Sequence, residues 1–430
     1  MKQFAIIFMR VCVILALTLP LPASAEATRT ASVVQITPSQ VPSINGKPVF
    51  PIVLSVIPAP DAKCPNGKSA WQEFRDAGAI FIRTTPPRSP NGDSRRWNDD
   101  AISRQAEYMD VAAKAGMFCI PTLNELSSVQ DKNLAKEERL RQFIRRFRNA
   151  PALGVWKGAD EPQWGREAVE PLLTAYRIIK EEDPNHPVWI AQAPRGTVEE
   201  LRPYNVAYDI GGVDVYPIGY PPGSHLIDPN ENKDISAVGD YTLKMLRVVD
   251  EQKPVWFTLQ VAWSGVAKGG RTLRFPTFPQ ERFMTYEAII NGARGLVYFG
   301  GGIQSTLNER DQPFGYNWTF WDRVLRPVIE EIGDKSPLAA ALCAADSKLP
   351  VKATGNAIEL SVREVGRDVF VLACCRDPQK TAEVKFTGLP NDVGEAAVLY
   401  ESPRKVTAKN GTFTDWFAPY DVHVYKFERR

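Results

Sequence analysis

Histidine and cysteine are scarce in this chain of 430 residues, which holds three histidines and six cysteines. The histidines (His186, His225 and His423) are scattered, so the sequence shows neither a His-based catalytic triad nor a zinc motif. Five cysteines follow the apolar N-terminal segment; an odd number without regular spacing is not a disulfide framework, although it leaves room for one bridge. We therefore expect a protein that works without a metal or another cofactor.

A charge excess and long apolar runs are also missing. The 52 Lys and Arg residues nearly balance 50 Asp and Glu residues, and no basic block or basic-aromatic interleave occurs, which argues against a nucleic-acid partner. Beyond the N-terminus, no run approaches the ~20 apolar residues of a membrane span. These absences predict a soluble protein and leave its oligomeric state open.

The one strongly apolar stretch has the features of a secretory signal peptide. Lys2 and Arg10 flank the run VCVILALTL, and Ala23-Ser24-Ala25 supplies small residues for cleavage. Residues 1–25 are therefore predicted to be a signal peptide, and the mature protein is expected to be secreted or periplasmic.

Downstream, near-continuous apolar segments alternate with helical patterns. Asn45-Gly46 predicts a turn before the first strand, and helices are predicted over Trp71–Ala77 and Asp99–Ala115, each ending at a glycine. Eight strands are expected over residues 49–56, 79–85, 117–125, 154–162, 187–194, 208–217, 254–263 and 295–302. Strands without polar alternation are buried on both faces, as in parallel sheets. Eight such units over residues 26–336 predict a (β/α)8 TIM barrel; a doubly wound sheet is the alternative fold, but no GxGxxG follows the first strand.

The pattern changes in residues 337–430. Short strands separated by turns are expected over Ala357–Val365, Asp368–Arg376, Thr381–Phe386, Glu395–Glu401 and Val422–Phe427, without a helical period between them. This region is predicted to be an all-β sandwich domain that packs on the barrel.

Polar residues gather where the predicted barrel strands end, which is where barrels place their active sites. The stretch GVWKGADEP begins as an apolar strand and ends in Asp160 and Glu161 before a proline. The other strand ends supply Arg83, Asn124, Glu125, Gln192, Asp214, Tyr216, Gln260, Trp263 and Phe299. One arginine with carboxylates, amides and aromatic rings suits a neutral polyhydroxylated ligand such as a sugar. Trp164 is a further candidate platform, although a single tryptophan is more often part of a core.

The chain resembles the (β/α)8-barrel glycoside hydrolase superfamily called clan A. The similarity rests on the opening NGKP, on Arg83 and Glu161 after the second and fourth strands, on Tyr216 after the sixth, and on GARGLVYF in the eighth. It implies that Glu161 is the general acid/base, that Arg83 orients the acidic site and that Tyr216 hydrogen-bonds near the reacting centre. A C-terminal β-sandwich is common in that group.

Two positions depart from the clan A pattern. Asp160 stands where an Asn usually precedes the acid/base, and Gln260 stands where the seventh strand usually carries a nucleophilic Glu. An amide cannot ionise, so it cannot form a glycosyl-enzyme intermediate. The first candidate for the second carboxylate is Asp214, which favours an inverting mechanism, and Asp160 and Glu125 follow.

The sequence thus predicts a hydrolase of O-glycosidic bonds that acts on a carbohydrate substrate, with Glu161 as general acid and Asp214 as its partner. The pKa of Glu161 would have to be raised by burial or by a carboxylate such as Asp160. Because neighbours on a strand point oppositely, Asp160 and Glu161 should face one atom only if the strand has already broken. The alternative is a carbohydrate-binding protein that lost its nucleophile, and structural roles stay open for Asp214, Arg83 and Gln260.

Overall fold

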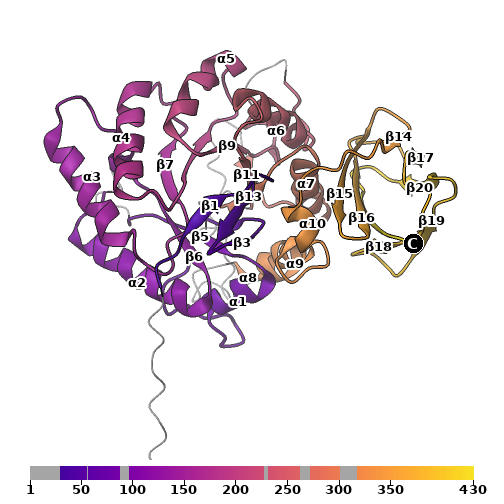
Figure 1. Ribbon diagram of the computed structural model, residues 1–430, viewed down its shortest axis with the longest axis horizontal. Coiled ribbons are helices and arrows are strands. Elements are labelled where there is room, and N and C mark those ends of the chain that lie inside the picture. The colour runs from indigo at the N-terminus through magenta and orange to yellow at the C-terminus, as the bar shows by residue number, and fades with distance from the viewer. Residues whose placement is uncertain (1–29, 56, 88–95, 227–230, 262–271, 301–316) are drawn as a thin grey trace, which may run out of the picture.

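The computed structural model describes residues 30–55, 57–87, 96–226, 231–261, 272–300 and 317–430 (Figure 1). The predicted signal peptide and Trp263 lie outside these residues. Eight parallel strands form the central sheet: β4 (Ile52–Leu54), β5 (Phe81–Thr84), β6 (Phe118–Pro121), β7 (Trp156–Asp160), β8 (Val188–Gln192), β9 (Ile210–Val215), β11 (Val255–Gln260) and β13 (Gly295–Phe299).

The sheet closes into a barrel. Its strands pair in the order β6-β5-β4-β13-β11-β9-β8-β7, and parallel bridges from Cys119 to Leu153 and from Thr122 to Lys157 join its two ends. One hydrophobic cluster fills the interior with side chains from seven of the strands and from Val155, which immediately precedes β7: Val53, Phe81, Ile120, Val155, Trp189, Ile210, Trp256 and Val297. The predicted TIM barrel is confirmed, and all eight strands end at one rim.

Helices surround the barrel (Figure 1). They are α1 (Ala70–Ala77), α2 (Asp99–Ala115), α3 (Leu134–Phe147), α4 (Val169–Glu182), α5 (Val198–Leu201), α6 (Ala237–Val248), α7 (Phe278–Ile290), α8 (Trp318–Phe320), α9 (Arg326–Ile332) and α10 (Ala339–Cys343), with the short 3-10 helices η1 (Asn124–Ser127) and η2 (Arg202–Ala207) and a π-helical turn η5 (Trp321–Leu325). Helices α1 and α2 end at Gly78 and Gly116, whose φ angles of 117° and 72° are left-handed. Both glycine stops are therefore as predicted.

A small antiparallel sheet precedes the barrel, where no strand was expected before the Asn45-Gly46 turn. It comprises β1 (Val34–Ile36), β2 (Pro42–Ile44) and β3 (Lys47–Pro48). Asn45 and Gly46 form the turn with φ angles of 50° and 82°. Val34 and Ile44 belong to the interior cluster, so this sheet covers the amino-terminal end of the barrel and leaves the opposite rim for a site.

The C-terminal residues form a β-sandwich. A five-stranded sheet contains β15 (Ile358–Val365), β16 (Asp368–Cys375), β18 (Val393–Leu399), β19 (Lys405–Thr407) and β21 (Val422–Arg429), and a three-stranded sheet contains β14 (Lys352–Ala353), β17 (Ala382–Thr387) and β20 (Phe413–Phe417). The predicted sandwich is confirmed. The strands β14, β19 and β20 were not foreseen, because two of them are very short and β20 follows a turn-rich stretch.

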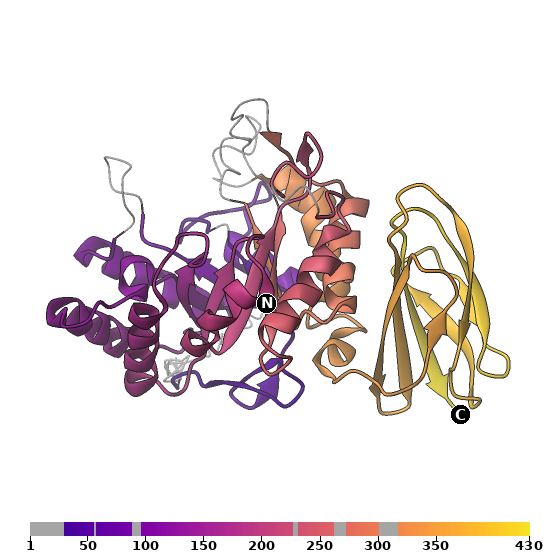
Figure 2. The ribbon, with the colours of Figure 1, turned by 90° about the horizontal axis from the view of Figure 1, so that it is seen from above.

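The sandwich stands beside helices of the barrel (Figure 2). Leu372, Cys374 and Val424 are buried in the same hydrophobic cluster as the barrel helices. Arg376 reaches across to Asp240 on α6 at 2.8 Å and to the buried Glu287 on α7 at 3.3 Å. The two domains therefore share apolar and ionic contacts.

Three further features concern the chemistry available to the fold. The cysteines Cys64, Cys119, Cys343, Cys374 and Cys375 are free thiols. Within the described ranges, no group of three or more His, Cys, Asp or Glu side chains could hold a metal ion. The helices described here are all too short or too polar to cross a membrane.

Candidate active site

The site begins where β7 breaks. Trp156 points outward, donating to the carboxylate of Asp183 at 2.8 Å, and Lys157 points inward with no exposed surface. The register shifts between Lys157 and Asp160, and Glu161 adopts a φ of 49°, which non-glycine residues rarely do. Strand alternation is lost here, so Asp160 and Glu161 lie close enough to influence each other's charge.

Asp160 is held between two cations. The ammonium of Lys157 lies 2.9 Å from one carboxylate oxygen, and the guanidinium of Arg83 lies 3.3 Å from the other. Partial removal from water opposes ionisation of Asp160, but the two cations outweigh this effect and hold its pKa below the usual range. Burial also lowers the pKa of Lys157, which the charge of Asp160 counteracts. Asp160 is thus a fixed negative charge and a poor proton donor.

Aromatic rings surround these cations. The Lys157 ammonium lies 5.0 Å from the ring centroid of Trp189, and the Arg83 guanidinium lies 5.9 Å from that of Phe299. Phe299 in turn stacks on Tyr216 with ring centroids 5.8 Å apart. Cation–π contacts in a desolvated setting stabilise the charged forms of Lys157 and Arg83.

Glu161 and Asp214 lie close enough for each to act on the charge of the other. Burial and then the charge of Asp160 raise the pKa of Glu161. Burial raises the pKa of Asp214 well above its usual range, and the charges of Glu161 and Asp160 add to this effect. Because two like charges at close range cannot both ionise readily, this carboxyl pair favours a state in which one of its members is protonated.

Tyr216 completes the pair's surroundings. It is buried, and burial followed by the charge of Asp214 raises its pKa well above the usual range. Tyr216 in turn opposes the rise in the pKa of Asp214, so it favours a negative charge on that carboxyl group. Arg83, Asp160, Glu161, Asp214 and Tyr216, which were all predicted from strand ends, therefore lie together.

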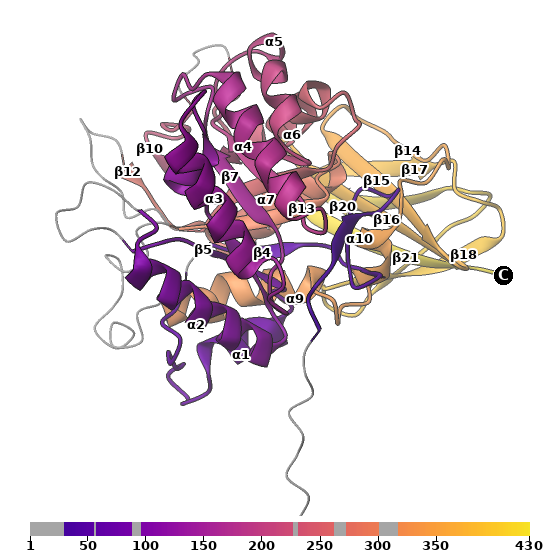
Figure 3. The same cartoon turned by 60° about the vertical axis from the view of Figure 1, so that its left-hand side comes forward.

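Gln260, for which a substrate contact and a structural role were both open, hydrogen-bonds the backbone of two segments. Its amide accepts from the backbone N–H of Ile218 at 3.0 Å and donates to the carbonyl oxygens of Ile218 and Arg274, each at 2.7 Å. The side chain is buried. Its polar atoms thus connect the loop after β9 to Arg274. Both segments adjoin the antiparallel pair of β10 (Gly219–Tyr220) and β12 (Thr272–Leu273). This strand pair lies on the far side of the barrel from the sandwich in Figure 3.

The remaining predicted residues contact neighbouring segments of the barrel. Glu125 accepts from the backbone N–H of Trp97 at 2.8 Å and lies 3.7 Å from Arg139 on α3, so its contacts are structural. Asn124 reaches only Thr85, at 3.5 Å, and the buried Gln192 accepts from the N–H of Gln163 at 3.4 Å.

Sequence reasoning missed Lys157, Trp189 and Arg195. A lysine inside a strand suggests a solvent-facing position, yet VWKGA is otherwise apolar. The single cation in a strand that is buried on both faces is the signal that could have identified Lys157. Arg195 follows Pro194 just beyond β8, and its positive charge lowers the pKa of Glu161 against the larger effect of burial.

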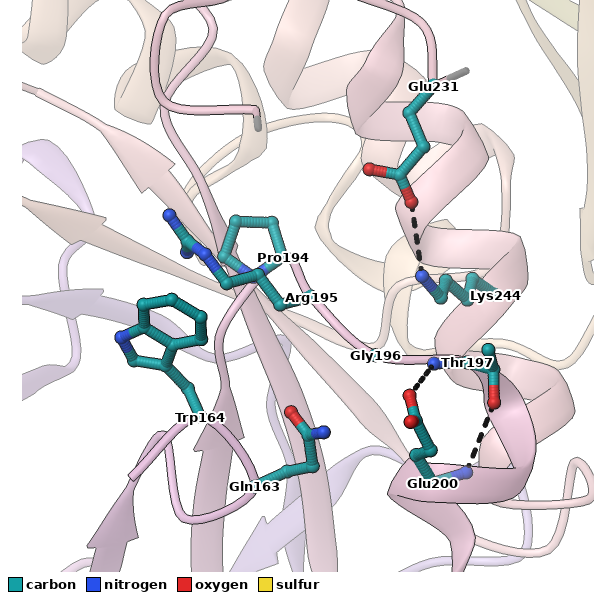
Figure 4. A pocket seen from close by; sticks show the side chains of 9 residues that line it. All are labelled: Gln163, Trp164, Pro194, Arg195, Gly196, Thr197, Glu200, Glu231 and Lys244. Carbon is teal, nitrogen blue, oxygen red and sulfur yellow. Dashed lines mark hydrogen bonds and ion pairs between the residues drawn. The ribbon is translucent and has the colours of Figure 1, made fainter. Parts of the chain in front are cut away.

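A pocket of about 600 Å³ lies between the loops after β7 and β8 and helix α6 (Figure 4). Arg195 in its wall is near enough to Glu161 to lower the pKa of that carboxyl group. Trp164 and Arg195 lie on one wall, with the guanidinium 4.3 Å from the ring centroid of Trp164. Lys244 and Glu231 face them and form an ion pair of 3.2 Å. The rim therefore combines an acid pair with a polar and aromatic pocket.

Comparison with known proteins supports the fold. No protein-family model and no curated protein matches the chain. Among solved structures, a glycoside hydrolase aligns with a TM-score of 0.63 at 12% identity over 92% of this chain and 97% of that one. A glycoside hydrolase family 5 protein from Bacteroides vulgatus ATCC 8482 gives 0.60 at 12% identity over 92% and 94%.

An α-amylase from Geobacillus thermoleovorans, complexed with acarbose, gives a TM-score of 0.57 at 12% identity over 89% of this chain and 98% of that one. At these identities the shared property is the fold. The barrel followed by a β-sandwich is a glycoside-hydrolase-like fold, and its strand-end rim carries a buried carboxyl pair.

Proposed function

We propose that the protein hydrolyses O-glycosidic bonds of an oligo- or polysaccharide, with Glu161 and Asp214 as the proton-transferring pair. The observation that carries this proposal is the closely spaced carboxyl pair at the carboxyl rim of a glycoside-hydrolase-like barrel. Glycoside hydrolysis needs one carboxyl group that donates a proton and another that is ionised. Two carboxyl groups that disfavour each other's ionisation can supply both forms at once.

The neighbours divide the roles. Asp160 forms ion pairs with Lys157 and Arg83 and stays ionised. Its negative charge makes it harder for Glu161 and Asp214 to be ionised at the same time. Asp214 is fixed within β9 and contacts Tyr216, whereas Glu161 is partly exposed and lies where the strand has ended. Glu161 is therefore the group that can meet a glycosidic oxygen as general acid/base, and Asp214 is its partner.

A second function, carbohydrate binding without catalysis, is favoured by Gln260. Its amide is fully engaged by Ile218 and Arg274, so the seventh strand supplies no ionisable group in the described residues and its polar end is structural. In this alternative the pair only hydrogen-bonds sugar hydroxyls.

A glycan-panel screen separates the two functions. Wild type, Glu161→Gln and the control Glu170→Gln, which alters an exposed residue of α4, are compared for hydrolysis and for binding. Loss of hydrolysis with retained binding in Glu161→Gln alone supports catalysis. Binding without hydrolysis in all three proteins supports the second function. We also propose that residues 1–25 direct export and are removed, which the N-terminal mass of exported protein tests.

A further inference from the structure

The pocket between the loops after β7 and β8 and helix α6 contains an arginine without an acidic partner. Arg195 forms no ion pair with any residue in the described part of the chain. Its Nε is buried without a hydrogen-bond partner, and one terminal nitrogen donates only a long bond of 3.5 Å to the carbonyl oxygen of His225. Most of its N–H groups are thus available to a ligand.

Trp164 orients this guanidinium. The Arg195 carbon lies 4.3 Å from the ring centroid of Trp164, which is 52% exposed (Figure 4). A guanidinium stacked on an aromatic face has its plane fixed, and its N–H groups then point outward from its edge. The stack therefore leaves a planar donor fork in the pocket.

The other charged groups of the pocket already have partners. Glu231 accepts from the hydroxyl of Tyr241 and pairs with Lys244 at 3.2 Å. Glu200 accepts from the backbone N–H of Thr197 at 2.8 Å as part of a capping box at the start of α5. Among the described residues that line this pocket, Arg195 is consequently the cation without a carboxylate partner.

The charge of the adjacent rim does not supply a carboxylate for Arg195. Asp160 is compensated by both Lys157 and Arg83. An anionic ligand would supply the missing carboxylate and a neutral ligand would not.

We propose that this pocket binds the carboxylate of a uronic acid unit, so that the substrate is an acidic glycan. The carboxylate would accept two parallel hydrogen bonds from Arg195, since both groups are planar and their geometries match. The inference rests on the proposed function for the location of the sugar, and it names the class of sugar that this same site selects.

Binding measurements test the inference separately from catalysis. In the Glu161→Gln background, calorimetry compares trimers of galacturonate and of glucuronate with their neutral methyl esters. We expect the acids to bind about 10- to 100-fold more tightly than the esters, as charge-assisted bidentate hydrogen bonds provide. Arg195→Gln should abolish this preference. Arg177→Gln, which removes an exposed arginine of α4, should leave it unchanged.

Arg195→Lys keeps the positive charge but loses the planar pair of donors and the contact with the Trp164 ring. This variant perturbs the fold less, and we expect it to show an intermediate preference for acids over esters. Equal affinity for acids and esters, a preference that survives Arg195→Gln, or selection of a sulfated neutral oligosaccharide over the uronates would overturn the inference. If uronates bind selectively while wild type hydrolyses nothing, the binding inference stands and catalysis fails. If wild type hydrolyses neutral glycans and shows no preference for acids, catalysis stands and the binding inference fails.

Discussion

Lys157 and Asp160 form an ion pair of 2.9 Å whose two ends lie in different surroundings. The side chain of Lys157 has no exposed surface, whereas that of Asp160 is 54% exposed. Lys157 therefore needs the ion pair to stay charged much more than Asp160 does, because Asp160 is also stabilised by Arg83 and by solvent.

This asymmetry predicts unequal effects of removing each partner. Asp160→Asn leaves a buried ammonium without its carboxylate and should lower the free energy of unfolding by about 3 kcal/mol. Lys157→Met should cost only about 1 kcal/mol, because Asp160 keeps Arg83 and solvent. Denaturant unfolding measures both.

The double variant sharpens this comparison. Lys157→Met with Asp160→Asn should be more stable than Asp160→Asn alone, since the fully buried ammonium of Lys157 is no longer present. Equal losses in both single variants, with simple addition in the double variant, would show that the pair does not stabilise Lys157.

The raised pKa of Asp214 predicts a pH dependence of stability. Between the unfolded pKa, near 3.8, and the higher folded pKa, the folded state binds more protons than the unfolded chain. The contribution of this group to stability is therefore complete below the unfolded value and is lost as the pH rises through the folded value, by at most about 1.4 kcal/mol per pH unit.

Asp214→Asn cannot ionise and should escape that loss. Its free energy of unfolding relative to wild type should rise between pH 4 and pH 8, as measured by urea unfolding at each pH. A difference that is constant with pH would mean that Asp214 titrates normally in the fold.

Gln260 is predicted to be structural. In Gln260→Glu, the carbonyl oxygens of Ile218 and Arg274 lose their donors, and a buried carboxylate is introduced, so stability at pH 7 should fall by about 2–4 kcal/mol. The deficit should shrink at acidic pH, where a protonated Glu regains one donor. Unchanged stability together with a gain in glycosidase activity would instead assign Gln260 to the substrate cleft.

Arg376 is predicted to couple the domains. Arg376→Gln removes the cation that pairs with the fully buried Glu287 and should lower the free energy of unfolding by about 3–5 kcal/mol, with faster hydrogen exchange in α7 and β16. The control Arg367→Gln changes an exposed arginine whose contacts lie within the sandwich. Similar effects of both variants would contradict a coupling role.

Much of this fold was predictable because its signals are local. Strands buried in a parallel sheet appear in the sequence as apolar runs. Gly78 and Gly116 mark helix ends at which the backbone adopts a left-handed conformation that glycine favours. Knowing that the fourth strand ends at Asp160 and Glu161 was sufficient to place both at the rim.

The pairing of groups was less predictable because it depends on distant segments. The amide of Gln260 is saturated by Ile218 and Arg274, which lie 42 and 14 residues away in the chain. The positive φ of Glu161 removed the strand alternation that otherwise governs where its side chain points. Lys157 was missed since only the closed barrel buries it beside Asp160 and Trp189.

The most direct test of the Glu161 assignment is the release of reducing ends from a glycan panel by wild type and Glu161→Gln at equal concentration. If Glu161 is the general acid/base, wild type cleaves at least one glycan, and the variant is slower by about 10²- to 10⁴-fold. The Glu170→Gln control keeps the wild-type rate. Equal rates for wild type and Glu161→Gln, or no cleavage of any acidic or neutral glycan by wild type, would contradict the assignment.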